Sequence, residues 1–312
     1  MASTMATEDK DNRIFLWFNP RSMSTAFTKC VSFMEGAHVW NEPYASCMLN
    51  EWFSNPEDMK RYPKLESTFQ QLTGTCKKVQ EFGHYYDGGT LKPTSVFTHE
   101  WFLGEIIKPL PKGKSFLFVK EDAACISGRF EMLPKVSFKH SFIIRNPLRS
   151  VSSVRKLFMT FFGYEDNPDD FDLYESNPFL DSETLPPNPC YDVWKYVKTN
   201  IDPNPVVIDA DDLRNFPDKI LRKYCEGVGI PFKAKYTKWE RSDSSMKYFN
   251  GSLDLMVWGK QNHVYDTAFE SDCFTPTTSP LPQFDDLTPD GQRYVLDLQD
   301  GFNEMYQSRI KP

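Results

Sequence analysis

Near its N-terminus the chain reads Ile14-Phe15-Leu16-Trp17-Phe18-Asn19-Pro20-Arg21-Ser22-Met23-Ser24-Thr25-Ala26. The five apolar residues at its start predict a buried strand that ends at Asn19-Pro20. Apolar residues then recur at helical spacing from Ala26 to Met34 and predict a helix. A helix start presents unpaired N–H groups and the positive end of the helix dipole, so this turn predicts an anion-binding site.

The polar turn after the first strand is not the phosphate loop of nucleotide triphosphatases. It lacks the Gly-x-x-x-x-Gly-Lys-Ser/Thr spacing, which disfavours an ATPase. A simpler alternative is that the hydroxyls from Ser22 to Thr25 only cap the helix, as serine and threonine commonly do.

Two further segments combine an apolar run with charged and polar residues. Ser141-Phe142-Ile143-Ile144 leads into Arg145-Asn146-Pro147, and Ser153 follows on the predicted helix. A strand-end arginine and a first-turn serine at this spacing can converge on one phosphate. Later in the chain, Val206-Val207-Ile208 precedes Asp211-Asp212-Leu213 and then Pro217.

In this order the three segments resemble the sulfotransferases that use 3′-phosphoadenosine 5′-phosphosulfate (PAPS). The resemblance implies an α/β fold of the P-loop NTPase-like sulfotransferase type, with a central, mainly parallel sheet flanked by helices. It also implies that Arg145 and Ser153 bind the 3′-phosphate of the donor and that no metal is needed. The residues implied to bind the 5′-phosphosulfate are Arg21, Ser22, Met23, Ser24, Thr25 and Ala26.

Late in the chain the pattern departs from the family. The cytosolic members close a lysine-glycine loop over the 3′-phosphate, and the nearest match here is the inverted pair Gly259-Lys260. By this resemblance, Gly259 and Lys260 are candidates for binding the 3′-phosphate of the donor. Ala210 stands where the family often has a tyrosine, so adenine stacking is expected to come from elsewhere.

The residues around Asn41-Glu42-Pro43 resemble bacterial and carbohydrate-type members more than the histidine-dependent phenol enzymes. In several carbohydrate-type members a glutamate at this position is the general base, which implies Glu42. Asp122 stands where the phenol enzymes have their histidine and is the second candidate; Lys120 is implied to stabilise developing charge. The alternatives are an ordinary strand-end carboxylate for Glu42 and a solvated helix start for Asp122.

The resemblance implies an enzyme that moves a sulfuryl group from PAPS to a hydroxyl or amine of a small acceptor by in-line displacement. A carboxylate base typically contributes about 10²- to 10⁴-fold to such a step. The alternative is a protein of the same fold that binds the nucleotide without transfer, or that uses transient sulfation to drive elimination or cyclisation. Several large aromatic residues either line an acceptor pocket or belong to the core; they are Trp40, Tyr44, Trp52, Phe161, Phe162 and Tyr164.

Composition restricts the partners. The net charge of −7 over 312 residues argues against binding to nucleic acid or to an anionic membrane, and the scattered lysines favour a small acceptor over an acidic polysaccharide. Oligomeric state stays open. The seven cysteines lack Cys-x-x-Cys spacing, so we expect free thiols and no structural zinc.

The first residues are polar, without a signal peptide or membrane anchor, and predict a cytoplasmic protein. We expect residues 1–12 to form a disordered tail and residues 13–312 to form a single sulfotransferase-like domain, because the three motifs must meet around one nucleotide.

Overall fold

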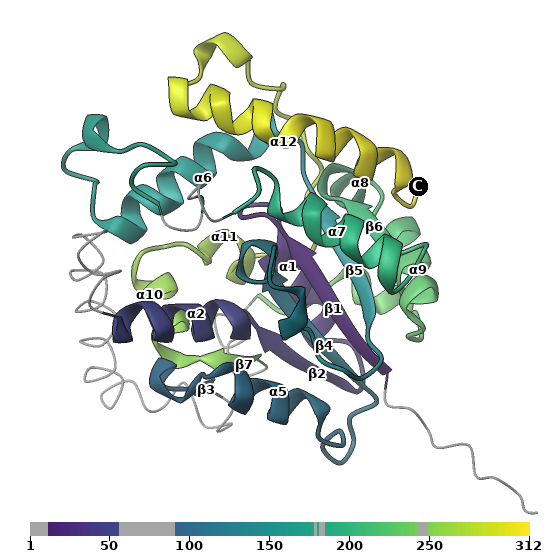
Figure 1. Cartoon of the computed structure of the whole chain (residues 1–312). Helices are drawn as coiled ribbons and strands as arrows, with labels where there is room; N and C mark the ends of the chain where they lie inside the picture. The colour runs from purple at the N-terminus through teal and green to yellow at the C-terminus, as the bar shows by residue number, and fades with distance from the viewer. Residues whose placement is uncertain (1–11, 56–90, 178–179, 181–184, 242–248) are drawn as a thin grey trace, which may run out of the picture.

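The computed structural model describes residues 12–55, 91–177, 180, 185–241 and 249–312 (Figure 1). The predicted tail lies outside these residues except for Asn12, which is the first residue of strand β1 (Asn12–Phe18). The strand predicted from the apolar run is therefore present and begins slightly earlier than expected.

One parallel sheet organises the described part of the chain. Its strand order is β3-β7-β2-β4-β1-β5-β6, and every pairing is parallel. The predicted α/β fold with a parallel sheet flanked by helices is confirmed (Figure 1). The remaining strands are β2 (Ala37–Asn41), β3 (Leu91–Lys92), β4 (Phe116–Asp122), β5 (Lys139–Ile144), β6 (Val206–Asp209) and β7 (Phe249–Ser252).

Alternate residues of β1 face two separate hydrophobic cores. Phe15 and Trp17 pack into one core with α2, α5, α6, α7 and α12, whereas Ile14, Leu16 and Phe18 pack into the other with α1, α9 and α11. This two-residue period explains why a central strand reads as a continuous apolar run. The helices are α1 (Ser24–Ser32), α2 (Pro43–Ser54), α5 (His99–Ile107), α6 (Pro147–Phe162), α7 (Pro189–Asn200), α8 (Ala210–Asn215), α9 (Pro217–Val228), α10 (Leu253–Gln261), α11 (Asp266–Phe269) and α12 (Pro289–Ser308).

The carboxyl ends of four neighbouring strands meet at one edge of the sheet. Phe18 at the end of β1 lies opposite Asp122 of β4, and Asn41 at the end of β2 lies opposite Lys120. Since all these strands are parallel, the turns that follow them emerge on the same side. Ligands of open α/β sheets bind at this edge.

Six cysteines, Cys30, Cys47, Cys125, Cys190, Cys225 and Cys273, are free thiols, as predicted. Cys76 lies outside the described residues. Among the helices that the structure describes, none combines the length and the apolar character needed to cross a membrane.

Candidate active site

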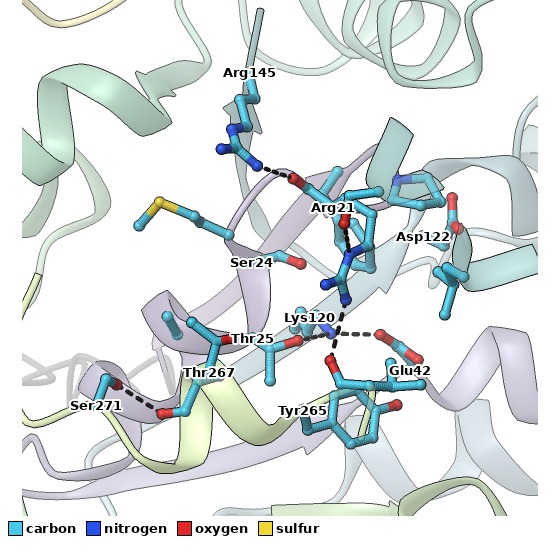
Figure 2. Close-up of a pocket in the computed structure, with 18 of the residues that line it drawn as sticks. Arg21, Ser24, Thr25, Glu42, Lys120, Asp122, Arg145, Tyr265, Thr267 and Ser271 are labelled. Atoms are coloured by element: carbon cyan, nitrogen blue, oxygen red, sulfur yellow. Dashed lines mark hydrogen bonds and ion pairs between the residues drawn. The ribbon is translucent and has the colours of Figure 1, made fainter. Parts of the chain in front are cut away.

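A cavity of about 360 Å³ opens at the carboxyl edge of the sheet. Both Arg21, from the turn after β1, and Arg145, from the turn after β5, line it (Figure 2). Its volume falls in the range of small-molecule sites, roughly 300 to 1,000 Å³. The two loops that were predicted to hold opposite ends of one ligand therefore share one cavity.

The turn after β1 has an unusual backbone. Arg21 and Met23 have φ angles of 65° and 69°, in the left-handed region that residues other than glycine rarely adopt. Met23 is the N-cap of α1, and no side chain caps this helix in the described structure. The interpretation of the hydroxyls as mere caps is therefore not supported, and the amide groups at the start of α1 can receive an anion.

The side chains of the two loops contact each other. Arg21 donates from Nε to Ser153 Oγ at 2.7 Å, and Arg145 donates from Nη1 to the Arg21 carbonyl at 3.0 Å. Arg145 Nε is buried and has no hydrogen-bond partner among the described residues. Burial lowers the pKa of both guanidinium groups, so two desolvated cations lie in one cavity. Such a site favours a ligand with two anionic groups.

Ser22 is an exception within the first loop. Its Oγ is buried without a partner among the described residues, and it lines a separate cavity of about 20 Å³ rather than the main one. The left-handed residues on either side of it turn Ser22 to the other side of the loop. The expectation that its side chain binds the donor is not met, whereas Met23, Ser24, Thr25 and Ala26 do line the main cavity.

Lys120 connects the turns after β1 and β2. Its ammonium group forms an ion pair with Glu42 and donates to Thr25 Oγ1 at 3.1 Å and to Asn41 Oδ1 at 3.3 Å (Figure 2). The side chain of Lys120 is 1% exposed and that of Glu42 is 17% exposed. A buried cation held by a carboxylate and two neutral oxygens is satisfied, and the carboxylate still reaches the cavity.

The backbone of Glu42 is fixed from both sides. Its φ angle is 52°, in the left-handed region, and its N–H donates to the Lys120 carbonyl at 2.8 Å. Its own carbonyl accepts from the Ser46 N–H at 3.1 Å, and Pro43 starts α2 immediately after it. A non-glycine residue in this conformation is strained, and the hydrogen bonds on both sides of it hold the strain in place.

Asp122 also lines the cavity, next to a second buried carboxylate. Its Oδ1 accepts from the Ala124 N–H at 3.0 Å, and burial raises its pKa from 3.8 to about 7. Glu121 is fully buried and accepts from the backbone N–H groups of Tyr44 and Ala45; its burial raises its pKa well above the ordinary value. The alternative of a solvated Asp122 is wrong, because β4 ends inside the protein.

The raised pKa of Asp122 gives a testable dependence of stability on pH. The folded protein holds this proton more tightly than the unfolded chain, so the stabilisation is complete below about pH 4 and is lost as the pH rises to 7. Between pH 4 and pH 8 the wild-type protein should lose about 2–4 kcal/mol of unfolding free energy through this group. The variant Asp122→Asn should not show this loss. Urea unfolding of both proteins at these pH values measures the difference; parallel pH profiles would contradict the assignment.

Gly259 and Lys260 do not occupy the predicted position. Both lie inside α10 rather than in a loop, and neither lines the cavity. Gly259 instead leaves room for the ring of Tyr265, which a Cβ atom at position 259 would approach to 2.1 Å. Tyr265 itself lines the cavity, and Arg21 donates from Nη1 to the carbonyl of the adjacent Val264 at 3.1 Å.

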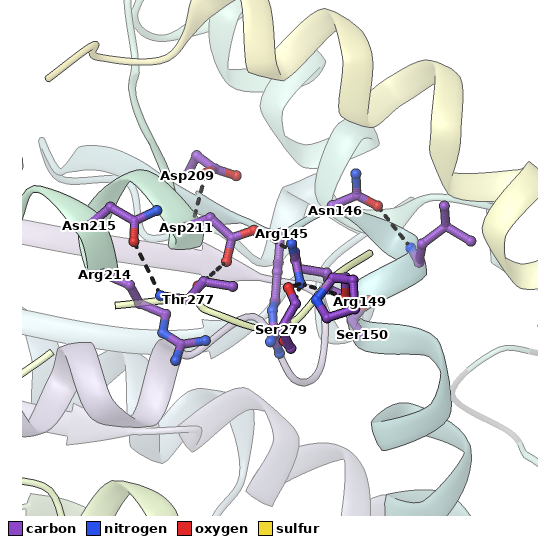
Figure 3. Close-up of polar contacts among 12 residues, drawn as sticks. Arg145, Asn146, Arg149, Ser150, Asp209, Asp211, Arg214, Asn215, Thr277 and Ser279 are labelled. Carbon is purple, nitrogen blue, oxygen red and sulfur yellow. Dashed lines mark hydrogen bonds and ion pairs between the residues drawn. The ribbon is translucent and has the colours of Figure 1, made fainter. Parts of the chain in front are cut away.

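A strap of residues 275–280 is attached to α6 and α8 next to the cavity (Figure 3). Arg214 donates from Nε to the Thr275 carbonyl at 2.6 Å, and Arg149 donates to the Ser279 carbonyl at 3.1 Å. Asp211 forms an ion pair with Arg149 at 2.8 Å and accepts from Thr277 Oγ1 at 2.8 Å. The Asp211-Asp212-Leu213 motif thus supports the strap.

Part of the cavity wall was not predicted from the sequence. Only Arg214 had a signal, because it follows Asp211-Asp212-Leu213 directly. The missed polar and aromatic residues include Arg214, Tyr265, Thr267, Ser271, Cys273, Phe274 and Thr275. Within the described ranges, no group of three or more histidine, cysteine or acidic side chains is arranged to hold a metal ion.

Comparison with known proteins finds that one segment of this chain is similar to a sulfotransferase family. Residues 202–292 match the family described as "Sulfotransferase domain". This segment contains Arg214, Tyr265 and the strap, while the loops with Arg21 and Arg145 lie outside it. The match agrees with the resemblance seen in the motifs at the level of the sulfotransferase family, without a subtype or an acceptor.

Two curated proteins and two solved structures are also similar to this chain. The Arabidopsis thaliana branched-chain-amino-acid aminotransferase-like proteins 2 and 1 are each 35% identical over 81 residues, which is 26% of this chain and 14% of theirs. The chain thus matches only a small part of their length. The sulfotransferase domain from the curacin biosynthetic pathway aligns with a TM-score of 0.47 and 15% identity, over 96% of this chain and 98% of its own. The sulfotransferase domain from the Synechococcus PCC 7002 olefin synthase aligns with a TM-score of 0.46 and 14% identity, over 93% of this chain and 96% of its own.

Proposed function

We propose that this protein is a PAPS-dependent sulfotransferase that sulfates a hydroxyl or amine of a small acceptor. The observation that carries the proposal is the meeting of Arg21, Arg145 and Ser153 in one cavity at the start of α1. The sulfotransferase match of residues 202–292 supports the same class of reaction.

The residues present fit a bisphosphorylated nucleotide. Within the described structure no side chain caps the start of α1, so its amide groups, together with Ser24 and Thr25, offer donors to a 5′-phosphosulfate. Arg145 and Ser153 both line the cavity and offer donors to a 3′-phosphate. PAPS, when bound, supplies an activated sulfuryl group whose leaving group is the 5′-phosphate.

The proposed transfer requires one base and several cations. The acceptor oxygen or nitrogen forms a bond to sulfur, the bond between sulfur and the bridging phosphate oxygen breaks, and the acceptor proton passes to the Glu42 carboxylate. Lys120 and Arg21 neutralise the charge that develops on the departing phosphate. The ion pair with Lys120 orients Glu42 toward the cavity before the reaction.

Calorimetry with adenosine 3′,5′-bisphosphate (PAP), the spent donor, tests the nucleotide site, with adenosine as the unphosphorylated control. We expect heat with the bisphosphate and much weaker binding of adenosine, because both arginines contact phosphate. Incubation with labelled PAPS and a panel of phenols, alcohols and amines then tests transfer. Absence of bisphosphate binding would overturn the proposal; binding without release of bisphosphate would indicate a nucleotide-binding protein that does not transfer.

A further inference from the structure

The cavity has an apolar wall that the donor site does not use. It is formed by residues of three helices, α2, α6 and α10, which line the same cavity as Glu42 and Asp122. We propose that this apolar wall binds the acceptor and selects an alcohol or phenol with an apolar, ring-sized body. This inference rests on the proposed sulfotransferase function. Residues of the wall are Ala45, Leu49, Leu157, Phe158, Phe161 and Trp258.

On α6 the wall continues directly from the donor site. Ser153, Leu157 and Phe161 all line the cavity and follow one another at four-residue intervals, so they lie on one face of the helix. The eight residues from Ser153 to Phe161 span about 12 Å of helix. Over about two turns, this face of α6 therefore changes from the Ser153 hydroxyl, which contacts Arg21, to the aromatic ring of Phe161.

On α2 the wall continues from the proposed base. Glu42 immediately precedes the helix, and Ala45 and Leu49 follow it three and seven residues later on the same face. An apolar body packed against Ala45 and Leu49 places its hydroxyl near the Glu42 carboxylate. The α2 part of the wall and the proposed base are thus positioned by one helix.

Two aromatic rings form a corner of the wall. The rings of Phe161 on α6 and Trp258 on α10 meet edge to face, with centroids 4.8 Å apart and an angle of 76° between their planes. Such rings bind other flat apolar groups by stacking or edge contacts. The corner therefore favours a ring or a branched hydrocarbon over an extended polar chain.

The distribution of charge disfavours a sugar acceptor. The described cations that line the cavity are Arg21, Lys120, Arg145 and Arg214. The first three contact the donor loops or Glu42, and Arg214 holds the strap. A sugar buried against aliphatic and aromatic side chains would lose hydrogen bonds to water without replacing them.

A homologous series of acceptors tests the inference. With 4-methylphenol, 4-ethylphenol and 4-propylphenol, kcat/KM should rise by about fourfold for each added methylene until the wall is filled. Glucose and N-acetylglucosamine should react at least about 10²-fold less efficiently than 4-propylphenol. Sugars that react as well as the phenols, or a flat response to the added methylenes, would overturn it.

Adjacent phenylalanines on α6 offer a matched pair of variants. Phe161 and Phe162 are both buried in the same core, but only Phe161 lines the cavity. Phe161→Leu should raise KM for 4-propylphenol by about tenfold without changing the affinity for PAP. Phe162→Leu should leave both unchanged. Equal effects of the two variants on KM would show that the ring of Phe161 acts only through packing and would contradict the inference.

Binding measurements separate this inference from the proposed function. Phenols and sugars are titrated into the enzyme saturated with PAP. Failure of the bisphosphate itself to bind would overturn the proposed function. A complex that forms but binds sugars and not phenols, or binds neither, would overturn the acceptor class alone.

Discussion

Glu42→Gln is expected to lower kcat by about 10²-fold or more and to leave the affinity for PAP nearly unchanged. The amide keeps the size and most of the hydrogen bonding of the carboxylate but cannot take the proton from the acceptor. Lys120 would lose its ion-pair partner, yet it keeps Thr25 and Asn41 as acceptors. Steady-state kinetics with a phenol acceptor, together with calorimetry of PAP, measures both quantities.

Asp122→Asn is the matched control for this result, since Asp122 also lines the cavity and has a carboxylate with a pKa of about 7. Its effect on kcat should be much smaller than that of Glu42→Gln, because the Asp122 side chain caps the short helix that follows β4 by accepting from the Ala124 N–H, whereas Glu42 is the proposed base. If Asp122→Asn abolishes turnover while Glu42→Gln does not, the two carboxylates have been assigned in the wrong order.

Arg145→Ala is expected to weaken PAP binding by about 10- to 100-fold, which is the usual range for losing a charge-assisted hydrogen bond. The guanidinium carries a buried Nε without a partner among the described residues, and it also holds the Arg21 carbonyl. Isothermal calorimetry with wild-type and variant protein measures the loss directly.

Adenosine 5′-monophosphate distinguishes a contact to the 3′-phosphate from a general defect of the cavity. This nucleotide lacks the 3′-phosphate, so wild-type protein and Arg145→Ala should bind it with similar affinity. A variant that loses both nucleotides equally would show that Arg145 supports the loop around Arg21 rather than the 3′-phosphate. Thermal unfolding of the variant checks that the fold is retained.

The two loops of the proposed donor site could be predicted from the sequence because they depend on local patterns. An apolar strand followed by a polar turn and a helix places Arg21 and Arg145 at the carboxyl ends of their strands. Since the sheet is parallel, those ends meet at one edge without further information. Glu42 and Lys120 were proposed from the resemblance to the family, and the structure places Glu42 directly after β2 and Lys120 within β4, opposite Asn41.

The rest of the wall depends on contacts between distant parts of the chain. Arg21 forms a hydrogen bond with the Val264 carbonyl, 243 positions later in the sequence, and no local sequence pattern predicts such a contact. The predicted loop position of Gly259 and Lys260 was wrong, because a glycine-lysine pair occurs in helices as well as in loops and does not by itself distinguish the two. The direction of the Ser22 side chain was not predicted, because it depends on left-handed conformations of Arg21 and Met23, and neither residue is a glycine that would have signalled them.

The left-handed backbone at position 42 narrows the set of amino acids that evolution or a designer can place there. Branched and bulky residues are strained in that conformation whatever their chemistry, while glycine, asparagine and aspartate tolerate it best. Of these three only aspartate retains a carboxylate, on a side chain one carbon shorter. Position 42 therefore tolerates few substitutions that would change the proposed activity, and new chemistry on this scaffold would arise more readily in the helices that form the apolar wall.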